Sequence, residues 1–207
     1  PNDRVTCVPV VTHSAAFPDH VPRYEEVQQE AARQGNGFIG SPAAKQYVLE
    51  KIYQTGLLYA PGEDYTYSDL GFILLGYLIE KISGTTLDRY CEEMIFSPLQ
   101  MSNTFFRNHG EALRDGEYAA TERCEWRRRI LCGEVHDENA YAMGGIAGHA
   151  GLFSTLDDVY TFMSTLHRCY QGSDDFIPQS IVQKFFSRQH FPEHSTRALG
   201  WDTPSKR

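Results

Sequence analysis

The segment from residue 60 to residue 76, APGEDYTYSDLGFILLG, constrains the fold more than any other part of the chain. Pro61-Gly62 predicts a turn. Ser68 is a favourable N-cap residue, and the apolar stretch after it predicts a helix over 68–82. Gly84 follows as the expected helix stop. The residues expected on the apolar face of this helix are Leu70, Leu74, Tyr77, Leu78 and Ile82.

Tyr67 stands directly before this predicted helix. A side chain at a helix N-terminus faces the positive end of the dipole and free N–H groups, which favours a negatively charged group. A tyrosine at this place can also be an aromatic residue that only packs, with Ser68 acting as a simple cap. Taken alone, the segment favours that second interpretation.

Helical periodicity dominates the rest of the chain, and strand signals are few. Ser41-Pro42 predicts a helix start, and Thr155 begins a capping-box pattern. A long stretch between Phe106 and Gly148 shows little periodicity. The other helices are expected over 24–34, 43–54, from residue 86 to Pro98, from 155 to Gly172, and from Pro178; strands are expected over 103–107 and 198–201.

Charge and composition exclude several classes of partner. The formal net charge of −8 argues against nucleic acid, which prefers a basic face. The basic cluster Arg127-Arg128-Arg129 is interpreted as a solvated loop. No apolar run reaches the roughly 20 residues that a transmembrane helix needs. The five cysteines form no CxxC pair and no zinc-ligand spacing, so neither a disulfide framework nor a cofactor is expected.

Two other patterns point to ligands. Residues 35–40 spell GxGxxG, but a polar helix is predicted before them where a dinucleotide site needs a strand, so we interpret them as a loop. His136, Asp137 and His149 share one segment and leave open a metal-dependent hydrolase, although no HExxH or HxH pair is present. Ordinary hydrogen bonding of loop histidines is the favoured interpretation.

Five blocks nevertheless resemble, in order, the family of β-lactamases, penicillin-binding proteins, D,D-peptidases and related esterases. Residues 60–76 are similar to the segment PGxxFxYSNxxYxLLGxIIE of that family. The other blocks are 12–18, similar to LLTHTSGLP; 84–104, similar to a stretch ending in PLGMxxT; 133–155, similar to VHDxNA…GGxAGHAGLFST; and 198–201, similar to GLGW.

The resemblance implies an α+β fold of the β-lactamase and D,D-peptidase type, of which this chain is mainly the helical lobe with a few strands. Residues 1–207 are expected to form the central part of a single domain. The implied function is a serine hydrolase that forms an acyl-enzyme on an amide or ester of a small-molecule or peptidoglycan-like substrate. The family is commonly exported, which suggests the cell envelope or periplasm.

The resemblance also implies roles for individual residues. It assigns Tyr67 as the catalytic proton shuttle and places Ser68, Asp69 and His149 among the substrate-binding residues. Asp69 stands where the family usually has Asn; an Asn amide can donate to a substrate carbonyl, whereas an ionised Asp only accepts. Ala16 replaces a usual Gly, which matters only if that turn needs a positive φ.

The nucleophile of the family lies in Ser-x-x-Lys, where the spacing puts hydroxyl and amine on one helix face. No serine in this chain has lysine three residues later. That motif is expected upstream of Pro1, and the family's Lys/His-Thr/Ser-Gly motif is expected beyond Arg207. A catalytically inactive helical binding module with the same scaffold is the alternative.

Overall fold

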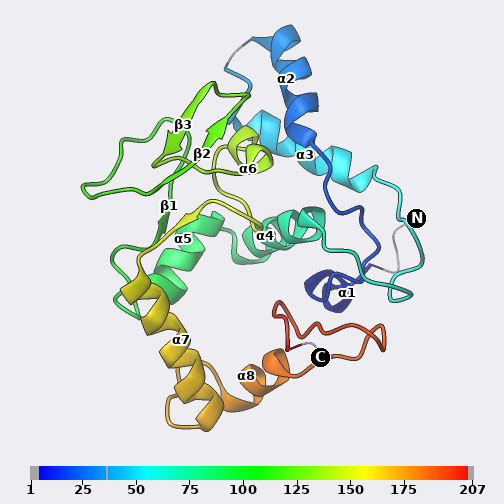
Figure 1. Cartoon of the computed structure of the whole chain (residues 1–207), viewed down its shortest axis with the longest axis vertical. Helices are drawn as coiled ribbons and strands as arrows, with labels where there is room; N and C mark the ends of the chain where they lie inside the picture. Colours follow the sequence, from blue (N-terminus) through cyan, green and yellow to red (C-terminus); the bar gives the residue numbers. More distant parts are fainter. Residues whose placement is uncertain (1–4, 36, 205–207) are drawn as a thin grey trace.

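The computed structural model describes residues 5–35 and 37–204, and it is mainly helical (Figure 1). Pro1 and Arg207, at the ends of the predicted central part, lie outside the described residues. The elements are α1 (Cys7–Val11), α2 (Arg23–Gln34), α3 (Pro42–Tyr53), α4 (Asp69–Ser83), α5 (Leu87–Cys91), the π-helical turn η1 (Glu92–Phe96), β1 (Phe105–Phe106), β2 (Ala120–Cys124), β3 (Arg129–Cys132), α6 (Glu138–Ala142), β4 (Leu152–Phe153), α7 (Leu156–Gln171) and α8 (Gln179–Phe186).

Helix α4 crosses the middle of the molecule and contacts α1, α3 and α5 (Figure 1). The helix begins at Asp69 and ends at Gly84, whose φ of 72° is left-handed, as predicted. The predicted apolar face is confirmed only in part: Leu70 is buried and Leu74 and Tyr77 pack against the core, whereas Leu78 and Ile82 are exposed. The buried face of α4 also carries Ile73 and two glycines, Gly71 and Gly76. Because glycine has no side chain, these two residues let neighbouring backbone and side chains approach closely. A pattern of apolar residues does not identify such positions.

The other predicted helices are present, with bounds close to those expected. Ser41 caps α3 by accepting from the N–H of Ala44, and Thr155 caps α7 by accepting from the N–H of Asp158. Gly172 ends α7 with a φ of 75°. Residues 37–40 lie between α2 and α3, so the described part of the GxGxxG segment follows a helix; Asn36 lies outside the described residues.

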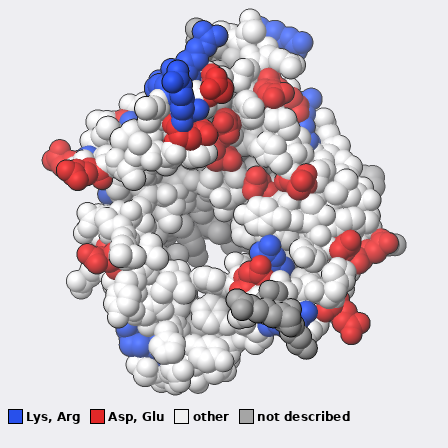
Figure 2. Space-filling model, in the orientation of Figure 1, with Lys and Arg blue, Asp and Glu red and all other residues white. Residues whose placement is uncertain are grey.

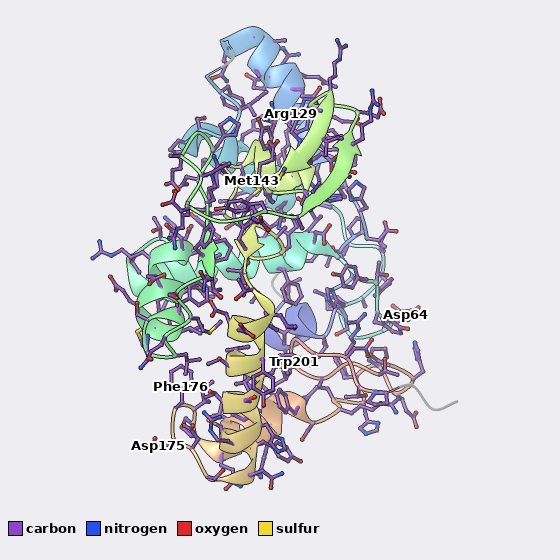
Figure 3. The ribbon with its side chains drawn as sticks, turned by 60° about the vertical axis from the view of Figure 1, so that its left-hand side comes forward. Asp64, Arg129, Met143, Asp175, Phe176 and Trp201 are labelled. Carbon is purple, nitrogen blue, oxygen red and sulfur yellow. The ribbon has the colours of Figure 1, made fainter. Side chains whose placement is uncertain are left out.

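The strands differ from the predictions. β1 pairs antiparallel with β4, within the strand predicted over 103–107. The hairpin of β2 and β3 lies in the stretch without periodicity and was not predicted. No strand forms over 198–201, because Gly200 has a φ of 77° and turns the chain back. The N–H of Ala198 therefore donates to the carbonyl of Trp201, and Trp201 packs edge-on against Phe186 of α8 (Figure 3).

Helices α7 and α8 contact each other and form an arm below α4 (Figure 1). Figure 2 shows the molecule hollowed between this arm and the body, with a largely uncharged surface on the α7 side. The apolar residues that recur at helical spacing in α7 are only partly buried: Leu166 is buried, whereas Val159, Met163 and Tyr170 are exposed. α8 covers one side of α7, so the periodicity identified the helix but not its covered side.

The basic cluster is only partly a solvated loop, which corrects the prediction. The side chain of Arg127 is 3% exposed, and its guanidinium donates to the carbonyl of Val135 and lies over the ring of Tyr141. Arg129 pairs with Glu134 on the exposed hairpin (Figure 3). Arg127 therefore joins the hairpin to the segment before α6.

Among the described helices, none is by itself both long and apolar enough to cross a membrane. The helix from Asp69 to Ser83 meets that criterion only together with the Leu87–Phe96 helix, and the two are bent by 76° relative to each other.

Candidate active site

Tyr67 is 60% exposed and lies two residues before the first residue of α4, close to the predicted helix start. Its ring stacks on the imidazole of His13, with the ring centroids 4.5 Å apart and the planes tilted by 32°. The guanidinium carbon of Arg197 lies 5.5 Å from the centroid of the Tyr67 ring. Two groups from distant parts of the chain therefore position an otherwise accessible phenol.

His13 is buried and has a left-handed φ of 56°. Its Nδ1 accepts from the N–H of Ser68 at 3.1 Å, and its carbonyl accepts from the N–H of Thr66 at 2.9 Å. Burial, reinforced by the positive charge of Arg197, lowers the pKa of His13 to about 4. The ring is therefore neutral at physiological pH, as an acceptor at Nδ1 must be.

Ser68 occupies the N-cap position of α4 but does not cap it through its side chain, which corrects the prediction. Its hydroxyl donates to the carbonyl of Pro18 at 2.6 Å, and the residue is 3% exposed. A buried hydroxyl that is already paired holds two segments together. The substrate contact implied by the resemblance would require this hydroxyl to leave Pro18.

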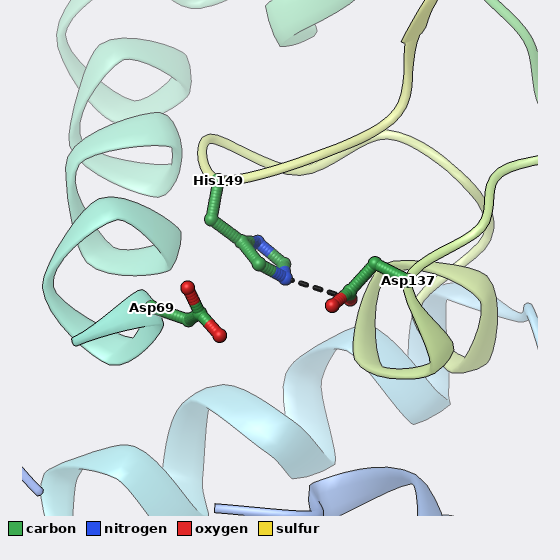
Figure 4. A group of neighbouring side chains, drawn as sticks. All are labelled: Asp69, Asp137 and His149. Atoms are coloured by element: carbon green, nitrogen blue, oxygen red, sulfur yellow. Dashed lines mark hydrogen bonds and ion pairs between the residues drawn. The ribbon is translucent and has the colours of Figure 1, made fainter. Parts of the chain in front are cut away.

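Asp69 begins α4 and is half-buried. Asp69, Asp137 and His149 each offer one ligand atom, and these atoms lie within 4.8 Å of one another (Figure 4). The pKa of Asp69 is raised above its usual value, mainly by burial. The nearby Asp137 also raises this pKa, whereas His149 acts in the opposite direction. The structure therefore brings together two residues from the resemblance, Asp69 and His149, with a third that it did not assign.

His149 and Asp137 form a close pair, with Nε2 of His149 2.8 Å from Oδ1 of Asp137 (Figure 4). The side chain of His149 is 4% exposed. Asp137 also caps α6 by accepting from the N–H of Ala140 at 2.7 Å. Although burial opposes its ionisation, the hydrogen bond and charge of His149 outweigh that effect and hold the pKa of Asp137 below its usual value.

Gly148 brings His149 against α4. A Cβ atom at residue 148 would lie 2.1 Å from the carbonyl oxygen of Phe72 and 2.9 Å from the backbone nitrogen of Gly76. Only a glycine permits so close an approach of the two backbones. The segment before β4 is therefore seated on the helix that carries Asp69.

The geometry only partly supports the alternative of a metal-dependent hydrolase that uses His136, Asp137 and His149. His136 is not a member of the cluster of Asp69, Asp137 and His149, and its Nε2 lies 3.4 Å from Glu122. A second cluster joins Glu122, Cys124 and Glu138. There the guanidinium of Arg127 donates to Sγ of Cys124 at 3.3 Å, and a cation at that sulfur disfavours a metal ion.

A cavity of about 570 Å³ lies beside the cluster. Asp137 lines it together with residues 150–155 and the loop over 115–119. Its wall combines apolar and polar groups, including Phe153 and Ser154. A concave space with a few polar groups next to titratable residues is a usual setting for a small-molecule site.

The fold and this arrangement define a class: the helical part of a β-lactamase-like fold, with an exposed tyrosine before its central helix. The chain belongs to the Beta-lactamase family, whose model matches residues 1–204. A relative from Salmonella enteritidis PT4, named "Putative D-alanyl-D-alanine carboxypeptidase", is 34% identical over 96% of this chain and 47% of its own length. A second relative, of the same name and from Escherichia coli K12, is 37% identical over 76% of this chain and 39% of its own length.

The chain thus spans about half the length of the curated relatives that it matches. Among solved structures, a penicillin-binding protein from Bacillus halodurans has a TM-score of 0.66 and 19% identity, over 97% of this chain and 56% of that one. This likeness confirms the predicted fold class.

Sequence reasoning missed three residues of the site. His13 and Asp137 lie within blocks that resemble the family, and this position could have identified them as site residues. The sequence assigned no role to His13, and for Asp137 only a metal-binding role was considered. Arg197 precedes the 198–201 block and carried no signal. Its place over Tyr67 depends on a turn that the sequence did not predict.

Proposed function

We propose that this chain is the central part of a serine hydrolase of the penicillin-binding-protein and β-lactamase type. The substrate class is a peptidoglycan-like D-alanyl peptide, as the names of the curated relatives suggest. The observation that carries the proposal is Tyr67: its ring is exposed and yet positioned by His13.

In such an enzyme a serine attacks the carbonyl carbon, the leaving group departs with a proton, and water later releases the acyl group. This chain supplies no Ser-x-x-Lys, so the nucleophile belongs to the remaining half of the protein. Tyr67 would carry a proton between the nucleophile, the leaving group and the attacking water. His13 acts through Tyr67 as a positioning residue.

The test uses the full-length protein. We expect a penicillin or fluorophosphonate probe to label one serine, and we expect release of D-alanine from a peptide ending in D-Ala-D-Ala. Labelling that is blocked by prior incubation with the peptide would link both activities to one site. Binding of the peptide without labelling or turnover would contradict the enzyme and favour the non-catalytic module.

A further inference from the structure

Helix α7 carries an apolar face that stays exposed. Leu156, Val159, Tyr160 and Met163 occupy positions i, i+3, i+4 and i+7 of the helix, so they lie on one side of it. All four side chains are exposed, and Leu156 and Tyr160 are exposed by 84% and 72%. We call these four residues the α7 stripe.

The opposite side of α7 is already packed. Asp158, Thr165 and Cys169 lie there and are buried. Helix α8 contacts α7, yet it leaves the α7 stripe exposed. A helix at the surface of a folded protein normally turns its apolar residues toward the core, so the stripe is an apolar face without a partner among the described residues.

Helices α7 and α8 stand apart from the main hydrophobic core. Among the residues that the structure describes, neither that core nor the side chains packed against it include any beyond Ala150. The attachments of these helices to the body include the carboxylate of Asp158, which accepts from the N–H of Asn103 and from the hydroxyl of Thr104. Hydrogen bonds contribute only modestly to stability, so the two helices need further apolar burial to hold their place.

The chemistry of the α7 stripe suits an apolar partner. It carries no charged side chain, because the charged residues Asp157, Asp158 and Arg168 lie elsewhere on the helix. The phenolic hydroxyl of Tyr160 is the main polar group that it offers. A contiguous row of exposed apolar side chains marks a contact surface, and here the contact requires a protein segment with an apolar face of its own.

We propose that the α7 stripe is the docking surface for the half of the same polypeptide that lies outside these 207 residues. The relative from Salmonella enteritidis PT4 matches this chain over 47% of its own length, which leaves more than half of that protein beyond the match. A segment tethered to the chain acts at a high effective concentration, so it outcompetes a second copy for the same surface. The inference concerns the assembly of the full-length protein and does not depend on the proposed hydrolase activity.

The test measures how fast a maleimide labels a cysteine placed at the α7 stripe of the full-length protein. Tyr160→Cys is the probe, and Ile130→Cys is the matched control, because Ile130 is an apolar residue of β3 that is also mostly exposed, by 64%. Mass spectrometry of the peptides separates these sites from the native cysteines. We expect labelling at position 160 to be slower than at position 130 by about 100-fold, a scale of protection set by local opening. Rates within about threefold of each other would overturn the proposal.

A second copy of the chain is the competing occupant, and dilution distinguishes the two. Protection of position 160 that stays constant on dilution supports a segment of the same polypeptide, because an intramolecular contact does not depend on protein concentration. Protection that is lost on dilution, together with a change from dimer to monomer in light scattering, would assign the α7 stripe to a second copy and overturn the proposal.

Thermal stability gives an independent readout through a variant that changes the shape of the side chain little. Val159→Thr in the full-length protein should lower the Tm by roughly 2–6 °C, because the contact would bury its hydroxyl. Ile130→Thr should leave the Tm within about 1 °C of the parent, and equal shifts in the two variants would contradict the proposal. These readouts are structural. An inactive protein with position 160 protected would support the inference and count against the proposed function, and an active protein with position 160 freely labelled would do the reverse.

Discussion

The N–H of Ser68 donates to Nδ1 of His13 over 3.1 Å, a contact between residues 55 positions apart in the sequence. The N–H of Thr66 donates to the carbonyl of the same histidine. His13 therefore holds the backbone on both sides of Tyr67 while its ring stacks against the phenol. One neutral imidazole fixes the start of α4 and the proposed catalytic side chain together.

This arrangement predicts a pH-dependent stability. The pKa of His13 is about 4 in the folded protein, against an ordinary value of 6.5 for histidine. The unfolded chain therefore takes up this proton at a higher pH than the folded chain does. The contribution of His13 to the free energy of unfolding is fully present above pH 6.5 and is lost as the pH falls toward 4, by up to about 3 kcal/mol.

His13→Asn is the matched variant for this prediction. Asn tolerates the left-handed backbone of residue 13, and its Oδ1 can accept from Ser68, but it does not titrate. Urea denaturation between pH 7.5 and pH 4.5 should show a steeper loss of stability in the parent than in His13→Asn. Parallel curves would mean that the proton uptake of His13 does not contribute.

Ala16 gives a second prediction. Its φ is 65°, so the turn that follows His13 does require the conformation that the family's usual Gly adopts freely. A non-glycine residue there is disfavoured by roughly 1–2 kcal/mol. Replacing Ala16 by Gly relieves this strain, but it also removes a buried methyl group and increases the entropy of the unfolded chain. We therefore expect Ala16→Gly to raise the free energy of unfolding by only up to about 1 kcal/mol.

Ala15→Gly is the control, since Ala15 is buried beside Ala16 but has no positive φ. This variant should lose roughly 1 kcal/mol of stability. Chemical denaturation of both variants checks the prediction, and a loss of similar size in the two would contradict the strain at Ala16.

Gly148→Ala is expected to separate His149 from α4. The added methyl would lie 2.1 Å from the carbonyl oxygen of Phe72, so either the helix or the loop must move. A loss of about 2 kcal/mol or more is expected from such overpacking. Gly56→Ala is the control, because a Cβ there meets nothing within 4 Å. Thermal denaturation should show a lower Tm for Gly148→Ala only.

Helices with regular caps and apolar periodicity could be predicted from the sequence, as α3, α4 and α7 show. The buried side of α3 follows from its apolar spacing, since Ala44, Val48 and Ile52 are all buried. The buried side of α4 follows only in part, because a close backbone contact between Gly76 and Gly148 takes the place of apolar side chains there. Short strands without alternation, such as β2 and β3, gave no signal.

The same distinction between local patterns and long-range contacts applies to the residues of the candidate site. Tyr67, Asp69 and His149 could be proposed from the sequence because local motifs that resemble the family carry them, and their roles stay predictions. The roles of His13, Asp137 and Arg197 depend on contacts between segments distant in the chain, such as the stacking of His13 on Tyr67. A single sequence does not encode those contacts in any local pattern.

The 207-residue chain on its own should not react with serine-directed probes, because it contains no Ser-x-x-Lys. A penicillin or fluorophosphonate probe should leave its mass unchanged, while the full-length protein gains one adduct. Stoichiometric labelling of a serine in the shorter chain would show that the nucleophile lies within these residues.

Tyr67→Phe in the full-length protein should lower kcat far more than it changes KM. The phenylalanine ring can still stack on His13, so the start of α4 should survive and only the proton-carrying oxygen is lost. General acid–base catalysis typically contributes about 10²–10⁴ in rate, and a loss on that scale in kcat marks a group that acts in the transition state. Tyr65→Phe is the matched control, because Tyr65 lies in the same loop and is also exposed. If Tyr67→Phe kept kcat within about three-fold of the parent, well below that range, Tyr67 would be a packed aromatic residue beside the helix start and the proton-shuttle role would be wrong.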